Sequence, residues 1–108
     1  EMATSILQKL GYRVTARTSS SDALSIFSAD PSIYDLVITD QTMPGMTGLE
    51  LSRRMLTLRS DLPIILCTGY GALLTKEDVC KLGIRELVLK PLTKKELASV
   101  VNKVLELT

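Results

Sequence analysis

Residues 36–40 read Leu-Val-Ile-Thr-Asp, a short apolar run that ends in a carboxylate. Two later runs also end in a polar group: residues 64–67, Ile-Ile-Leu-Cys, precede Thr68, and residues 87–89, Leu-Val-Leu, precede Lys90. If the three runs are parallel strands of one sheet, their carboxyl ends meet at one edge, where open α/β sheets place their chemistry. The sequence therefore predicts that a carboxylate, a hydroxyl and an ammonium group share a single site.

Helical and strand-like patterns alternate along the rest of the chain. The strand patterns cover residues 12–17, 36–39, 63–67 and 84–89, and the helical patterns cover 2–10, 19–30, 47–58, 75–83 and 93–105. Four of the helices open on a Ser or Thr followed three residues later by Asp or Glu, at Ser19, Thr47, Thr75 and Thr93. Strict alternation predicts an α/β fold in which helices cover both faces of a parallel sheet. The chain opens within a helical pattern, with no strand pattern before it.

Composition narrows the classes of function. A chain of 108 residues is long enough for one domain with a real core. Its net charge is +1, and its basic residues form no continuous stripe of the kind that indicates nucleic-acid binding. The apolar runs fall well short of the ~18 residues that a membrane span needs. The chain has no histidine, which excludes Ser-His and Cys-His nucleophile pairs and histidine metal sites.

The two cysteines, Cys67 and Cys80, fall in a strand pattern and a helical pattern. Neither has a metal-ligating neighbour, and a disulfide framework would need more of them. We expect two buried or half-buried free thiols in a reducing compartment, the cytoplasm.

A longer motif surrounds the first candidate residue. Residues 40–48 read Asp-Gln-Thr-Met-Pro-Gly-Met-Thr-Gly, Thr68-Gly69 follows the next strand pattern, and Lys90-Pro91 follows the one after. Together these motifs and their spacing resemble the receiver domain of two-component response regulators, over the whole chain. Residues 63–70 are similar in form to the receivers of hybrid histidine kinases.

The resemblance implies a flavodoxin-like, doubly wound parallel sheet of strand order 2-1-3-4-5 in a single domain, residues 1–108. It implies that Asp40 takes a phosphoryl group from a histidine kinase or a histidine phosphotransfer protein and so switches a signalling output. A carboxylate can form an aspartyl-phosphate, and Lys90 and Thr68 would supply a cation and a hydroxyl to its oxygens. Such a domain is a phospho-acceptor and no enzyme in the usual sense, although it can catalyse its own phosphorylation and dephosphorylation. The resemblance is also compatible with a homodimer.

The resemblance also implies Mg²⁺, which oxygen ligands hold in octahedral geometry. Those ligands would be the Asp40 carboxylate, the backbone carbonyl of Thr42 and an acidic pair at the end of a first strand. Because the chain opens in a helical pattern, we expect a receiver domain that lacks its first strand. The metal site is then incomplete in this chain.

Two further expectations concern the strand that ends before Lys90. The family often places an aromatic residue three positions before the lysine, where this chain has Leu87. The coupling of that position to Thr68 is therefore expected to differ, and the signal would travel through the loops and residues 79–84. The Lys90-Pro91 peptide is expected to be cis, as the resemblance implies.

Two other functions stay open. A pseudo-receiver would keep the fold as an interaction module without being phosphorylated, which a missing acidic pair would favour. An aspartate-nucleophile phosphatase usually needs a second Asp two positions after the first as general acid. Because position 42 is Thr, this reading is the weaker one.

Overall fold

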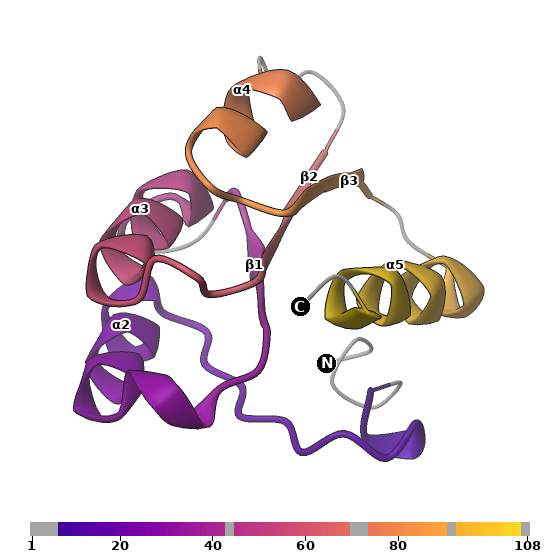
Figure 1. The fold of residues 1–108 in the computed structure, drawn as a ribbon, viewed down its shortest axis with the longest axis horizontal. Helices are drawn as coiled ribbons and strands as arrows, with labels where there is room; N and C mark the ends of the chain where they lie inside the picture. Colours follow the sequence, from indigo (N-terminus) through magenta and orange to yellow (C-terminus); the bar gives the residue numbers. More distant parts are fainter. Residues whose placement is uncertain (1–6, 43–44, 70–73, 91–92, 107–108) are drawn as a thin grey trace.

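The fold is built on a parallel sheet of strands β1 (Val37–Asp40), β2 (Ile64–Thr68) and β3 (Glu86–Leu89), in the order β1-β2-β3 (Figure 1). The computed structural model describes residues 7–42, 45–69, 74–90 and 93–106. Val37 pairs with Ile64 in one ladder, and Ile65 pairs with Glu86 in the other. The alternating pattern therefore predicted both the α/β class and the parallel pairing correctly.

The helices begin where the predicted capping residues stand. In the described part of the chain the capped helices are α2 (Ser20–Ala29), α3 (Gly48–Leu58), α4 (Lys76–Lys81) and α5 (Lys94–Glu106), with a short 3-10 helix, η1 (Pro31–Ile33), after α2; residues 7–9 are helical as well. In each of the four α-helices, the capping hydroxyl accepts a backbone N–H three residues on, at 3.0–3.4 Å. Each such bond satisfies one N–H group that the helix itself leaves unpaired.

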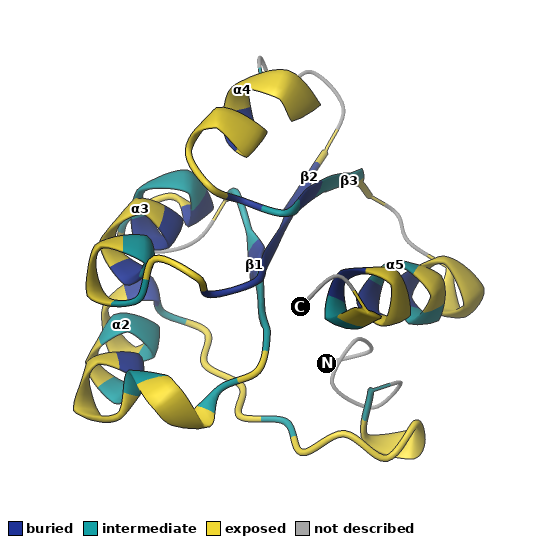
Figure 2. Ribbon diagram, in the orientation of Figure 1, coloured by how far each residue is buried: buried dark blue, intermediate teal, exposed yellow. Residues whose placement is uncertain are grey.

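Both faces of the sheet are covered, and β2 lies in the middle with every residue buried (Figure 2). Helices α2 and α3 lie on one side of the sheet and α5 on the other (Figure 1). Side chains alternate along a strand, so Ile64 and Leu66 join the core cluster with α2 and α3, whereas Ile65 and Cys67 join the cluster with α5. A strand that is buried on both faces explains the continuous apolar run in the sequence.

Two expectations are wrong. Residues 12–17 form neither helix nor strand. Five of the six are exposed and no ladder pairs them with β1, and an extended segment becomes a strand only through a neighbour's backbone. The thiol of Cys80 is exposed, because α4 turns Val79 and not Cys80 into the core. Cys67 is buried as expected, and both cysteines are free.

A buried carboxylate joins β3 to two helices. The Glu86 side chain is only 10% exposed and receives Lys76 Nζ from α4 at 2.8 Å and Lys103 Nζ from α5 at 3.3 Å. Burial alone would raise the pKa of Glu86, but the hydrogen bonds and charges of the two lysines outweigh it and hold that pKa below its ordinary value. The same contact raises the pKa of Lys76. The charge on Glu86 therefore stabilises the packing of α4 and α5 at neutral pH.

Glu86→Gln should lower the thermal midpoint at neutral pH by roughly 5 °C, the shift that about 1 kcal/mol produces in a domain of this size. A carboxyl whose pKa is depressed by folding contributes stability that is lost as the pH falls through its folded pKa. The difference between the variant and the wild type should therefore shrink as the pH falls below the ordinary pKa of a glutamate, and it should vanish only below the depressed pKa of folded Glu86. Thermal melts across this range, with the exposed Glu77→Gln as control, check it. A difference that persists unchanged in acid would contradict it.

Candidate functional site

The carboxyl edge of the sheet brings together the ends of all three strands. Asp40 is the last residue of β1, Thr68 is the last of β2, and Lys90 directly follows β3. In the ladders Asp40 stands opposite Cys67, and Thr68 stands opposite Leu89. The Lys90 N–H donates to the Thr68 carbonyl at 2.8 Å, which extends the ladder into the site. The structure therefore places the three predicted residues on one edge.

Asp40 and Lys90 are in direct contact. Lys90 Nζ lies 2.9 Å from Asp40 Oδ1, and the two side chains are 48% and 43% exposed. An ion pair this open to water stabilises a fold by only about 0–1 kcal/mol. The pair is better suited to hold and neutralise a carboxylate that solvent and a ligand can reach than to support the core. Thr68, in contrast, is only 4% exposed and joins the site through the backbone bond to Lys90.

The first turn of α3 lies against Asp40. A Cβ added at Gly48 would overlap the backbone carbonyl oxygen of Asp40 and lie 2.8 Å from Leu66 Cδ1. Only glycine lets the helix approach the strand end this closely. The closeness places the positive end of the α3 dipole beside the backbone of Asp40, and a helix N-terminus favours negative charge nearby.

The first N–H groups of α3, which have no acceptor within the helix, donate to other parts of the protein. Gly48 N–H donates to the Gln41 backbone carbonyl at 3.0 Å, Leu49 N–H to Gln41 Oε1 at 2.9 Å, and Glu50 N–H to Thr47 Oγ1 at 3.2 Å. The role of Gln41 was missed from the sequence, because its bonding partners stand seven and eight residues away. Helix α3 therefore acts on Asp40 through its dipole and its position, with its first N–H groups committed to the protein.

The described residues do not make a complete metal site. In the part of the chain that the structure describes, no group of three His, Cys, Asp or Glu side chains could hold a metal ion. Of the expected oxygen ligands for Mg²⁺, the Asp40 carboxylate and the residue Thr42, which is exposed, are present. The oxygen chemistry suits Mg²⁺, but the described residues supply only one carboxylate and one carbonyl of the ligand set that the resemblance implies. The chemistry that the described residues themselves can supply therefore comes from Asp40, Lys90 and Thr68.

Leu87, in the position where the family often has an aromatic residue, is half-buried against the core cluster that includes α2 and α3. This side chain is therefore part of the packing. Other expectations fall on residues 2–6 of the first helical pattern, on Met43-Pro44 and on Pro91, which lie outside the described residues. The expected cis peptide before Pro91 is among them.

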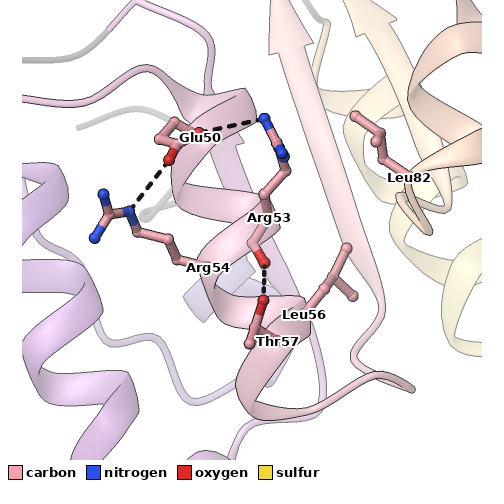
Figure 3. A pocket seen from close by; sticks show the side chains of 6 residues that line it. All are labelled: Glu50, Arg53, Arg54, Leu56, Thr57 and Leu82. Carbon is pink, nitrogen blue, oxygen red and sulfur yellow. Dashed lines mark hydrogen bonds and ion pairs between the residues drawn. The ribbon is translucent and has the colours of Figure 1, made fainter.

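A shallow depression lies elsewhere on the surface, lined by five residues of α3 and by Leu82 (Figure 3). The carboxylate of Glu50 pairs there with Arg53 at 3.7 Å and with Arg54 at 3.3 Å (Figure 3). These three charges lie on exposed side chains and neutralise one another in part. None of the three predicted site residues lines the depression, so it is separate from the candidate site.

Comparison with known proteins settles the family. The model of the response regulator receiver domain matches residues 1–102. The chain belongs to this family of receiver domains. Among solved structures, a response regulator receiver domain protein from Clostridium thermocellum aligns with a TM-score of 0.87 and 30% identity, over 94% of this chain and 80% of that one. The receiver domain of NtrX from Brucella abortus, at 22% identity and a TM-score of 0.88 over 99% of this chain and 89% of that one, supports the fold.

Relatives of this receiver domain occur in proteins of different size. The aerobic respiration control sensor protein ArcB of Escherichia coli is 34% identical over 94% of this chain, and the chain spans only 13% of ArcB. The response regulator receiver protein CpdR of Brucella abortus is 31% identical over 92% of this chain, which here spans 81% of the relative.

Among the residues that the structure describes, every helix is too short or too polar to span a lipid bilayer.

Gly48→Ala should destabilise the domain by roughly 1–3 kcal/mol, the usual cost of forcing extra atoms into a packed interior. The added methyl must displace either the Asp40 backbone or the α3 N-terminus. Gly69→Ala is the matched control, because a Cβ at position 69 meets nothing within 4 Å. Urea unfolding of both variants checks this. Equal midpoints would show that α3 can move away from Asp40 at little cost.

Proposed function

We propose that this receiver domain is a phospho-acceptor and that the 108 residues act as one unit in a two-component phosphorelay. Asp40 takes the phosphoryl group, and Lys90 and Thr68 assist. The observation that carries the proposal is the Asp40–Lys90 contact of 2.9 Å at the carboxyl edge, with both side chains open to solvent. A structural ion pair has no need of this exposure, whereas a group-transfer site must be reached by its donor.

The proposed reaction is an in-line transfer from a phospho-histidine. Lys90 holds Asp40 Oδ1, and Oδ2 attacks the phosphorus. The new P–O bond forms as the P–N bond breaks, and the electron pair of that bond goes to the leaving imidazole nitrogen, which takes a proton from solvent water. The Lys90 ammonium balances charge on one phosphoryl oxygen, and the Thr68 hydroxyl donates to another. The dipole of α3 adds to the same field.

The donor is proposed to be a histidine kinase or a histidine phosphotransfer protein in the cytoplasm. Receiver domains of two-component systems interact with such proteins, and membership of this family supports the assignment. Mg²⁺ bound by the Asp40 carboxylate, the Thr42 backbone carbonyl and further oxygen ligands would neutralise part of the charge on the phosphoryl group. The response of the domain would be its own change of state after phosphorylation, with no separate substrate turned over.

One observation favours a second function. The described residues include no cluster of three His, Cys, Asp or Glu side chains that could hold a metal ion, so the acidic pair that the family uses for Mg²⁺ is not found among them. A receiver fold that cannot hold the metal could serve as an interaction module that is never phosphorylated. Phosphorylation of the chain itself separates the two functions.

Asp40→Asn should abolish phosphorylation of the chain by a small phosphodonor such as acetyl phosphate. The amide keeps the shape of the side chain but is too weak a nucleophile to form a stable acyl phosphate. Phosphorylation is measured by intact-protein mass spectrometry with Mg²⁺ present. Asp35→Asn, at an exposed carboxylate five residues earlier in the chain, is the control and should be labelled as the wild type is. A wild-type protein that takes no label would favour the interaction module.

Lys90→Ala should slow phosphorylation roughly tenfold or more and should change the thermal midpoint little. The first effect follows from the loss of the cation beside the phosphoryl oxygens. The second follows because the exposed ion pair contributes about 0–1 kcal/mol. Labelling rates and melts of this variant are compared with those of Lys81→Ala, which removes an exposed lysine of α4. A large drop in stability with normal labelling would make Lys90 a structural residue.

A further inference from the structure

We propose that Gln41 is a positioning residue for phosphorylation at Asp40, because it fixes the start of α3 beside the carboxylate. The inference rests on the proposed function. It concerns a residue that the phosphoryl group does not touch.

Gln41 makes three hydrogen bonds that tie the end of β1 to its neighbours. Its N–H donates to the Cys67 carbonyl on β2 at 2.8 Å. Its backbone carbonyl accepts from Gly48 at 3.0 Å, and its side-chain Oε1 accepts from Leu49 at 2.9 Å. The residue that follows Asp40 therefore bonds to the central strand on one side and to the first turn of α3 on the other.

The hydrogen bond from the Leu49 N–H to Gln41 Oε1 acts as a helix cap, although Gln41 lies eight residues before Leu49 in the sequence. The N–H groups of the first turn need acceptors, and the usual source is the capping residue just before the helix. Here Thr47 serves Glu50, whereas Gln41 serves both Gly48 and Leu49. Since Gly48 lies against the Asp40 carbonyl, loss of the side-chain bond frees the helix start at the point where it touches the phospho-acceptor.

A second tie lies just before α3. The hydroxyl of Ser20, a fully buried residue at the start of α2, accepts the Met46 N–H at 2.7 Å. Gly45 precedes this contact with a φ of 93°, and a Cβ there would lie 2.7 Å from Ser20 Oγ. The left-handed conformation and the close approach both require glycine. The connection from β1 to α3 is thus fixed by Gln41 at its start and by Ser20 near its end.

Phosphoryl transfer depends on such fixation. The attacking oxygen must stay in line with the phosphorus, and misplacement by a fraction of an ångström costs rate. Asp40 is half-exposed, so its own packing constrains it little. Its orientation depends on Lys90 at the carboxylate and on its backbone, which Gln41 fixes.

The test compares Gln41→Met with the wild type. Methionine has a similar length and volume but lacks the amide oxygen, and Gln8→Met, at an exposed position, makes the same chemical change away from the site. Labelling by acetyl phosphate with Mg²⁺ is followed under conditions where urea melts show every variant fully folded. Gln41→Met should be labelled roughly three- to tenfold more slowly, the range of one hydrogen bond. Gln8→Met should match the wild type.

Amide hydrogen exchange by NMR tests the geometry apart from the chemistry. The Leu49 amide should exchange faster in Gln41→Met, and Gln41→Glu, which keeps an oxygen at the same reach, should restore slow exchange. Equal labelling rates for the wild type and Gln41→Met would overturn the inference and leave the proposed function standing. Unchanged Leu49 exchange in Gln41→Met would overturn the geometry on which the inference rests. If the wild type takes no label, the proposed function fails and the inference fails with it.

Discussion

The contact between Asp40 and Lys90 depends on the register of three parallel strands. These two residues lie fifty positions apart in the sequence, and they meet because β1 and β3 flank β2 and all three end at the same edge. What holds that register is the burial of β2 on both faces, since a slip by one residue would exchange the side chains of its two cores. The core therefore places the site, while the ion pair itself adds little to the stability of the fold.

Stability and chemistry occupy different parts of the same sheet. Glu86 is buried and holds α4 and α5 through two lysines, whereas Asp40 is open to water and holds one. Both are carboxylates that pair with lysine. The difference in exposure separates the structural pair at Glu86 from the solvent-accessible pair of the proposed site. Gly48 links the two roles, because the packing of α3 brings its positive end to Asp40.

The sequence predicted best what short-range chemistry decides. The four helix starts followed from hydroxyls that bond within three residues, and the position of Asp40, Thr68 and Lys90 at one edge of the sheet followed from the ends of apolar runs. The expected strand at 12–17 failed because strand formation depends on a neighbour that no local pattern reveals. Gln41 and the Glu86 pairs were missed for a related reason, since their partners are set by the packing of distant elements. Local sequence patterns thus predicted most of the helices and strands, whereas the contacts of Gln41 and Glu86 depend on how distant elements pack.

Chemical trapping of the modified residue tests the central claim most directly. Borohydride reduces an aspartyl-phosphate to homoserine, and peptide sequencing by mass spectrometry then reads the position. If the chain is labelled by a phosphodonor with Mg²⁺ and reduced in this way, the account predicts homoserine at position 40 and aspartate at positions 35 and 61, whose carboxylates are exposed. Homoserine at another position, with Asp40 unmodified, would contradict the assignment of the site.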